Sequence, residues 1–478
     1  MRFISNQFMN PAFGLAIALA ATGARADIPA GCSAVTEAEF TTTTVVNRAA
    51  GLDEPIKMDF DPISKDVVDI YWVERKGAVK RYDATAKAVV VLGTVAHNDE
   101  FESGVTGIIL DKAFKTNKRV YIYYSFGNAT AFEFRLGRFV LGADGKLDVG
   151  SEKVVLKIPA GFKKMHTGGA MAWDPAGNLY LTIGENEGGF GGPANTNDLR
   201  GKILRIHPEE DGSYTVPDGN LFAKGMAKTK PEIYVMGVRN AYSMSYDPNT
   251  KGIVWGDVGP DGTGVTEEDN FAKAPGNYGW PMYAGNNQTL KGSSPASAPK
   301  NTDGANTGLT DLPAAKPGTY SYQQQCAVSG PIYRYDGGLD SKRKFPPHFD
   351  GRWFVTDCNN GQMDTLLLNG SQDGVTNHAR VFPKVRFTRP LDLKFGPDGA
   401  LYVINYAGWF SADAATSIQR IEYTGNCLPV GPSALRPQSA AREASRQRNL
   451  SLLRRGGGAL IPWVGLHMVD GRAAAGTP

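Results

Sequence analysis

A weak repeat runs through most of this chain and limits the folds that it can adopt. Six times, a large apolar residue is followed by Asp-Pro or a related turn, and then by a run of aromatic and β-branched residues. A turn followed by such a run indicates a β-hairpin. Six hairpins over about 370 residues predict an all-β protein, either a six-bladed β-propeller with four antiparallel strands per blade or a pair of β-sandwiches. The six turns begin at Phe60, Leu110, Trp173, Tyr246, Phe349 and Phe395.

The composition excludes some classes of function. The 57 glycines and 29 prolines suit many short strands joined by turns. The net charge is only +3, and no basic stripe occurs before the C-terminal segment, so we expect no nucleic-acid partner. Beyond the N-terminus no stretch is long and apolar enough to be a transmembrane helix.

The two ends of the chain differ from its centre. Residues 1–26 combine a basic Arg2, a short apolar run and an Ala-Arg-Ala cleavage signal. Because no stop-transfer pattern follows, this segment predicts a cleaved signal peptide rather than an uncleaved anchor, and hence a secreted or periplasmic protein. Residues 27–428 are expected to form the propeller. Residues 429–478 are basic and poor in aromatic residues, which is typical of a linker or disordered tail.

Export makes the four cysteines interpretable as disulfides. They have no C-x-x-C spacing, and an even number in an exported protein favours two bonds. Three pairings are possible. We expect Cys32–Cys427, because a closed propeller would bring its two ends together, and Cys326–Cys358, because these two are neighbours in the sequence.

Polar residues collect where strands break into loops, which is where sites are built. One string, MHTGGAMAWDPAGNLYLTIGENEGG, covers residues 165–189, and GVRNAYSMSYDP, WGDVGPDG, EEDN and GNYGWP follow within residues 237–281. In their order and in their residues, these strings resemble the motifs of the PQQ-dependent glucose/sorbosone dehydrogenase family, whose members are calcium-using quinoprotein propellers. The resemblance spans roughly residues 52–425 and favours the propeller over the sandwiches.

The resemblance implies roles for individual residues. It makes His166 the general base that accepts the proton of a sugar hydroxyl, because a neutral imidazole can do so at pH 7. It places Arg239 and Asn240 at the quinone oxygens of PQQ, where Arg239 stabilises the charge that develops on reduction. Arg389 would pair with a PQQ carboxylate, and Glu102 would lie at the mouth of the site, near the sugar or the cofactor. The predicted cofactor-binding residues are therefore Glu102, His166, Arg239, Asn240 and Arg389.

The resemblance also implies calcium. The carbonyls of Gly259 and Pro260 would bind the ion that holds PQQ, since a hard cation accepts backbone oxygens readily. The Glu268 carboxylate and the Tyr278 carbonyl would bind a second ion.

Two positions depart from the family pattern. Leu391 and Asn359 stand where an arginine and a lysine are expected. PQQ carries three carboxylates, and each buried carboxylate needs a cationic or hydrogen-bonding partner. Lys384 and Arg386 are nearby in the sequence and are candidate replacements.

The resemblance therefore implies an oxidoreductase that uses PQQ and Ca²⁺, oxidises an aldose sugar at C1 to its lactone, and passes electrons to an external small molecule or cytochrome. Two alternatives remain open. One is a non-catalytic propeller that binds carbohydrate or protein, which Leu391 and Asn359 favour. The other is a calcium-dependent lactonase-type hydrolase, which would need carboxylate and Asn ligands converging on one metal.

Overall fold

The computed structural model describes residues 35–262, 266–292, 294–323 and 326–427. These residues all belong to one structural unit, residues 1–429, and the second unit, residues 430–478, lies outside them. The predicted signal peptide, the predicted tail and Cys32 are also outside the described residues.

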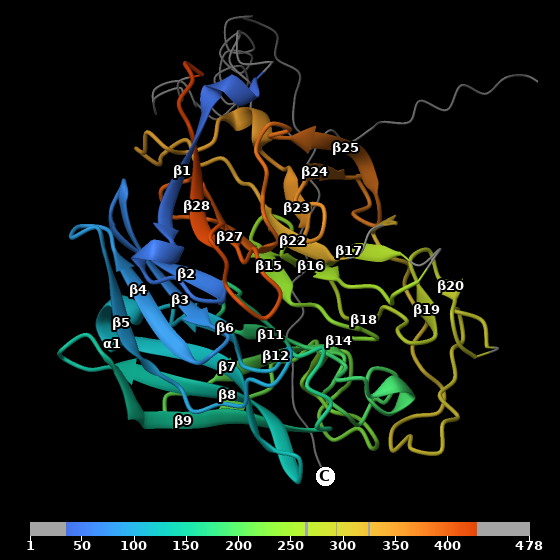
Figure 1. Ribbon diagram of the computed structural model, residues 1–478. Helices are drawn as coiled ribbons and strands as arrows, with labels where there is room; N and C mark the ends of the chain where they lie inside the picture. The colour runs from blue at the N-terminus through green and yellow to red at the C-terminus, as the bar shows by residue number, and fades with distance from the viewer. Residues whose placement is uncertain (1–34, 263–265, 293, 324–325, 428–478) are drawn as a thin grey trace, which may run out of the picture. The chain divides into compact units, whose positions relative to one another are not determined.

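In each of the first three blades, the four main strands pair antiparallel and follow one another along the chain (Figure 1). Blade 1 contains β2 (Pro55–Ser64), β3 (Val67–Glu74), β4 (Ala78–Asp83) and β5 (Ala88–Thr94). Blade 2 contains β6 (Val105–Leu110), β7 (Arg119–Asn128), β8 (Ala131–Leu141) and β9 (Leu147–Ala160), with the short helix α1 (Phe114–Asn117) before β7. Blade 3 contains β10 (Gly168–Trp173), β11 (Leu179–Ile183), β12 (Lys202–Pro208) and β14 (Ile233–Met236), to which β13 (Tyr214–Thr215) and β18 (Gly276–Asn277) add.

The other three blades complete the ring. Blade 4 contains β15 (Ser243–Asp247), β16 (Gly252–Asp257), β17 (Glu267–Ala272) and β21 (Tyr320–Tyr322), and the hairpin β19 (Tyr283–Ala284) and β20 (Gln288–Thr289) precedes β21. Blade 5 contains β22 (Ala327–Ile332), β23 (Trp353–Asp357), β24 (Met363–Leu368) and β25 (Val375–Val381). Blade 6 contains β26 (Pro390–Phe395), β27 (Leu401–Asn405), β28 (Ser417–Tyr423) and β1 (Phe40–Asn47). Short 3₁₀ turns cover Glu37–Glu39, Arg48–Ala50, Gly189–Gly191 and Pro347–Phe349.

The ring closes through the first strand of the chain. β1 pairs antiparallel with β28, so residues from the start of the described chain complete the last blade. The first strand of each blade contacts that of the next, in the order β2, β6, β10, β15, β22 and β26, and β26 contacts β2. This closure confirms the predicted six-bladed propeller.

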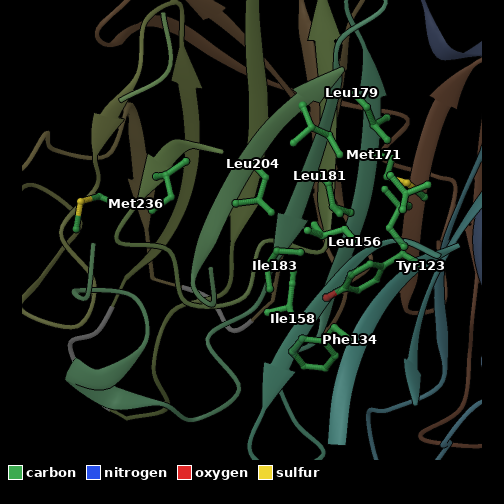
Figure 2. Close-up of a cluster of buried hydrophobic side chains, with 14 of the residues drawn as sticks. Tyr123, Phe134, Leu156, Ile158, Met171, Leu179, Leu181, Ile183, Leu204 and Met236 are labelled. Atoms are coloured by element: carbon green, nitrogen blue, oxygen red, sulfur yellow. The ribbon is translucent and has the colours of Figure 1, made fainter. Parts of the chain in front are cut away.

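The core is divided among the blade interfaces. Six clusters of buried apolar side chains each join two neighbouring blades. Between blades 2 and 3, for example, Tyr123 and Phe134 pack beside Leu181 and Ile183 (Figure 2). Apolar burial stabilises by about 25 cal/mol per Å². These six clusters therefore fix the blades, and with them the loops at the ends of the first strands.

The sequence repeat corresponds to the blades. Five of the six turns lie at the end of a blade's first strand or in the connection to its second strand, from Leu110 in blade 2 to Phe395 in blade 6, and the one at Phe60 lies inside β2. The spacing is uneven because some blades carry long insertions. One of them lies between β17 and β21, and Asn301 joins it to the connection after β11 by donating to the carbonyls of Phe190 and Ala194.

The Cys326–Cys358 disulfide is present and joins the start of blade 5 to the end of its second strand. The pairing of Cys32 with Cys427 stays a prediction, because Cys32 is not among the described residues. Within the described part of the chain, no helix is long and apolar enough to cross a membrane.

Candidate active site

A cavity of about 470 Å³ lies at one end of the ring of first strands. All five residues predicted to bind the cofactor line it: Glu102, His166, Arg239, Asn240 and Arg389. The walls come from all six blades, at or just before the start of each first strand. The wall residues that show this are Ile56, Thr106, Gly168, Tyr242, Cys326 and Leu391.

His166 is fixed by two carboxylates. Its side chain is buried, and Nδ1 lies 2.8 Å from Oε1 of Glu185, which follows β11. Its backbone has a φ of 50° and donates from N to Oε2 of Glu102 at 2.7 Å. An ionised carboxylate only accepts hydrogen bonds, so this contact puts the ring proton on Nδ1 and leaves Nε2 as the proton acceptor.

Asp257 aligns the Arg-Asn pair. It ends β16, and its carboxylate accepts hydrogen bonds from the backbone N of Arg239 (3.0 and 3.1 Å) and of Asn240 (2.7 Å). Burial, opposed by these donors, raises the pKa of Asp257 to about 6. The side chain of Arg239 donates to the carbonyl of Val258 at 3.0 Å and lies over the Trp280 ring. Both members of the pair are thus held in place before any ligand binds.

Arg389 has unused donors. Its Nε and Nη1 atoms are buried and have no hydrogen-bond partner, and burial lowers its pKa. Its guanidinium lies 3.7 Å from the centroid of the Trp409 ring. A buried donor without a partner costs about 1–3 kcal/mol, and more when it is charged. Arg389 therefore suits an anionic group that enters the cavity.

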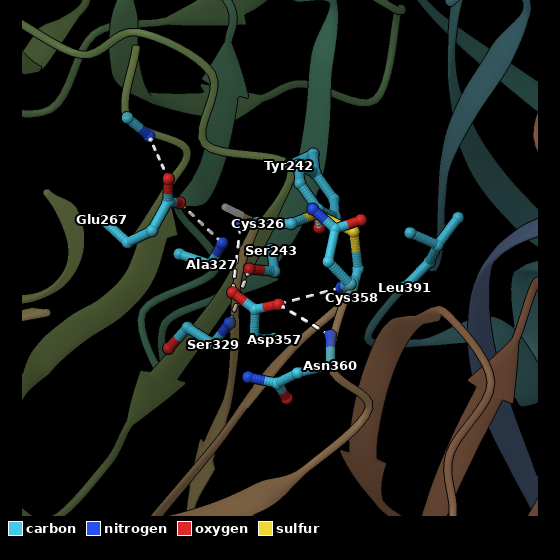
Figure 3. The surroundings of a disulfide bond; sticks show 12 residues. Tyr242, Ser243, Glu267, Cys326, Ala327, Ser329, Asp357, Cys358, Asn360 and Leu391 are labelled. Atoms are coloured by element: carbon cyan, nitrogen blue, oxygen red, sulfur yellow. Dashed lines mark hydrogen bonds between the residues drawn. A yellow bond between two sulfur atoms is a disulfide. The ribbon is translucent and has the colours of Figure 1, made fainter. Parts of the chain in front are cut away.

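Apolar groups occupy the neighbouring wall. Leu391 lines the cavity beside the Cys326–Cys358 disulfide, and the Tyr242 hydroxyl lies 3.0 Å from Sγ of Cys326 (Figure 3). Asn359 is exposed and is not a lining residue. The expected cations are therefore absent from these two positions.

The two candidate replacements do not fill the gap. Lys384 and Arg386 are exposed and are not among the lining residues. Arg75 does line the cavity, but its Nε is 2.6 Å from Oε2 of the buried Glu54. Arg239 and Arg389 are thus the lining arginines whose charge is best placed to meet an anionic ligand.

The four predicted calcium-binding residues come together. Gly259, Pro260, Glu268 and Tyr278 line a second cavity of about 10 Å³, and Arg239 and Val258 line both cavities. A volume of this size holds about one water-sized sphere. The structure thus places around one small cavity the residues that sequence reasoning had divided between two ions.

The Glu268 side chain is buried in the wall of this second cavity. Its carboxylate accepts hydrogen bonds from the backbone N of Gly285 and from Nδ2 of Asn270. Burial, followed by the nearby Asp257, raises the pKa of Glu268 to about 8. Within the described residues, no three His, Cys, Asp or Glu side chains form a metal-binding group. A cation here would need backbone carbonyls in addition to Glu268.

Sequence reasoning missed several residues of the site. Glu185 stands in the quoted GENEGG string and Asp257 in the quoted WGDV string, but neither carboxylate was singled out. The available signal in both cases was an acidic residue at or just beyond the end of a β-rich run. The disulfide was expected, but its place in the cavity wall was not, because strand order alone does not show which way the two cysteines face.

The protein is thus a propeller with a carboxylate-bound histidine and two arginines around one end of its ring of first strands. The chain belongs to the glucose/sorbosone dehydrogenase family, whose model matches residues 52–408. This confirms the resemblance seen in the motifs.

Individual proteins are similar to this chain in sequence or in fold. The aldose sugar dehydrogenase YliI of Escherichia coli (strain K12) is 26% identical over 313 residues, which are 63% of this chain and 74% of the relative. A putative oxidoreductase (glucose dehydrogenase) from Thermus thermophilus superposes with a TM-score of 0.61 at 25% identity, over 80% of this chain and 99% of that one. The PQQ-bound aldose sugar dehydrogenase of Streptomyces coelicolor gives a TM-score of 0.58 at 20% identity, over 81% and 99%.

Proposed function

We propose that this protein is a PQQ- and calcium-dependent oxidoreductase that oxidises an aldose sugar at C1 to its lactone by hydride transfer to the quinone. The observation that carries the proposal is the convergence of Glu102, His166, Arg239, Asn240 and Arg389 on one cavity. Membership of the glucose/sorbosone dehydrogenase family supports it, as do relatives described as an aldose sugar dehydrogenase and as a PQQ-bound enzyme.

The residues present fit the cofactor. The unsatisfied donors of Arg389 suit a carboxylate of PQQ, and Arg239 with Asn240 supplies further donors in the same cavity. Gly259, Pro260, Glu268 and Tyr278 are the residues that would hold calcium beside it. When bound, PQQ supplies the hydride acceptor and calcium supplies a Lewis acid.

His166 performs the proton step. Nε2 accepts the proton of the C1 hydroxyl, and the carboxylate of Glu185 stabilises the imidazolium that forms, because it already bonds Nδ1 at 2.8 Å. Glu102 keeps the His166 backbone in its left-handed conformation. The guanidinium of Arg239 stabilises negative charge in the cavity, with its own position fixed by Asp257 and Val258.

The N-terminal segment directs the protein to the periplasm or the outside of the cell, where an external small molecule or a cytochrome accepts the electrons.

Reconstitution tests the proposal. The purified chain is titrated with PQQ in the presence of Ca²⁺, an aldose is added, and the quinone absorbance and dye reduction are followed. We expect the spectrum of reduced quinone and sugar-dependent dye reduction. Failure of the chain to bind PQQ at every calcium concentration tested would contradict the proposal.

That result would favour a second candidate, a non-catalytic carbohydrate- or protein-binding propeller. The specific observation behind this candidate is the apolar Leu391 in the cavity wall, together with the exposed Asn359.

A further inference from the structure

An exposed aromatic group borders the candidate active site. We call Phe101, Trp409 and Phe410 the aromatic rim; all three line the cavity. Phe101 is 49% exposed and Trp409 is 61% exposed, and both belong to the small set of large apolar side chains that the described residues expose. Phe101 comes from the connection between β5 and β6, and the other two come from the connection between β27 and β28.

The rim is held in place by specific contacts. The rings of Phe101 and Phe410 lie with centroids 4.6 Å apart, and Phe410 follows Trp409 directly in the chain. The guanidinium of Arg389 stacks on Trp409 at 3.7 Å, and Arg75 donates from Nη1 to the carbonyl of Phe101 at 3.0 Å.

The backbone conformation also indicates that surrounding contacts hold the rim in place. Phe101 has a φ of 57° and Phe410 a φ of 48°. Bulky residues rarely adopt this left-handed conformation, and it persists only where surrounding contacts enforce it. Exposed aromatic side chains held in this way at a cavity mouth indicate a contact surface for a ligand.

The depth of the cavity determines what the rim would contact. His166, the proposed base, is only 6% exposed, so the sugar ring that reacts must enter beneath the rim. A further sugar ring attached to it would then lie at the mouth. A pyranose ring can place its apolar C–H face on an aromatic ring while its hydroxyl groups stay in water, which suits a half-exposed ring such as Trp409.

Two of the three rim residues lie beyond the part of the chain that the family model matches. The match ends at residue 408, directly before Trp409 and Phe410, whereas Phe101 lies inside it.

We propose that the aromatic rim is a subsite for a second sugar ring, so that the favoured substrates are disaccharides or longer oligosaccharides oxidised at their reducing end. This inference rests on the proposed function for its reaction, but the binding of the second ring is a property of the rim alone. A planar aromatic electron acceptor is the other occupant that such a surface could hold, and the experiment distinguishes the two.

The first test compares substrates. Trp409→Ala and Phe101→Ala are assayed with glucose and maltose beside Met226→Ala, a control at a 45% exposed residue that does not line the cavity. In the rim variants we expect the ratio of the maltose KM to the glucose KM to rise about tenfold, as for the loss of one aromatic contact. The control should keep the parent ratio.

Two outcomes of this test would overturn the proposal. One is an equal change in both sugar KM values for both rim variants. The other is a rise confined to the KM of the dye, which would assign the rim to the electron acceptor.

The second test needs no cofactor and no turnover. Saturation-transfer NMR on the PQQ-free protein with maltose should show transfer to the protons of the non-reducing ring, and this signal should fall in Trp409→Ala but not in Met226→Ala. No transfer to that ring in the parent would overturn the subsite. Transfer without any sugar oxidation by the PQQ-loaded protein would sustain the subsite and contradict the proposed function instead.

Discussion

The two sides of the cavity are built differently. On the side of blades 2 to 4, carboxylates hold the proposed base and the Arg-Asn pair: Glu185 and Glu102 hold His166, and Asp257 holds the backbone of Arg239 and Asn240. On the side of blades 5 and 6, the wall is made of Leu391, the disulfide and Trp409, and Arg389 keeps donors without a partner.

This difference suggests that the first side carries out the reaction and that the second side binds the ligand. Residues that move a proton or stabilise charge need fixed positions, and hydrogen-bonded carboxylates supply them before a ligand arrives. A wall that only holds a ligand can change its composition, provided that its polar groups find partners when the ligand binds. We therefore expect substitutions on the first side to affect turnover and substitutions on the second side to affect binding.

His166→Ala should have the largest effect. Removing the general base should lower sugar-dependent dye reduction by a factor of about 10²–10⁴, while PQQ binding changes much less. Steady-state kinetics and a PQQ titration of the same preparation check this. His207→Ala, at a histidine that contacts Asn178 in blade 3, is the matched control and should keep the parent turnover. A loss smaller than about tenfold would remove His166 from its role.

Arg239→Ala should come next on the same side. The loss of one charge-stabilising donor typically lowers turnover by about a hundredfold or more. Since Asp257 bonds only the backbone of residue 239, the variant should keep its fold and its calcium response. Turnover and thermal unfolding with and without Ca²⁺ measure the two effects separately. An unfolding midpoint that no longer responds to calcium would show that Arg239 supports the small cavity instead.

Arg389→Ala tests the other side, where binding should change more than turnover. Leaving a cofactor carboxylate without its charged partner should raise the Kd for PQQ about thirtyfold, which corresponds to about 2 kcal/mol. Fluorescence titration with PQQ measures it. Arg386→Ala, at an exposed arginine outside the cavity, should bind PQQ like the parent. Equal affinities for the two variants would mean that the donors of Arg389 serve another ligand.

The fold could be predicted from the sequence because its signal is local and repeated. Each blade carries one turn from Phe60 to Phe395, in its first strand or between its first and second strands, so uneven spacing did not hide the number of blades. The site residues in loop strings were also predicted. The partners that fix them were not, because Glu185 meets His166 only after the connection past β11 folds back on it, and Trp409 meets Arg389 across blade 6. Such contacts depend on side-chain direction, which the order of residues does not specify.

The smallest expected effect concerns the cavity that adjoins both sides. A ligand that binds only the folded protein stabilises it by RT ln(1 + [L]/Kd), about 2.7 kcal/mol at one hundred times Kd. The unfolding midpoint of the parent should therefore rise with Ca²⁺. In Glu268→Gln the rise should be smaller, because the amide keeps an acceptor oxygen but cannot release a proton to become a carboxylate ligand when the ion binds. Glu209→Gln, in blade 3 and outside both cavities, should respond like the parent. Superimposable calcium titrations for the parent and Glu268→Gln would exclude Glu268 as a ligand, and any ion at Gly259 and Pro260 would then be held without it.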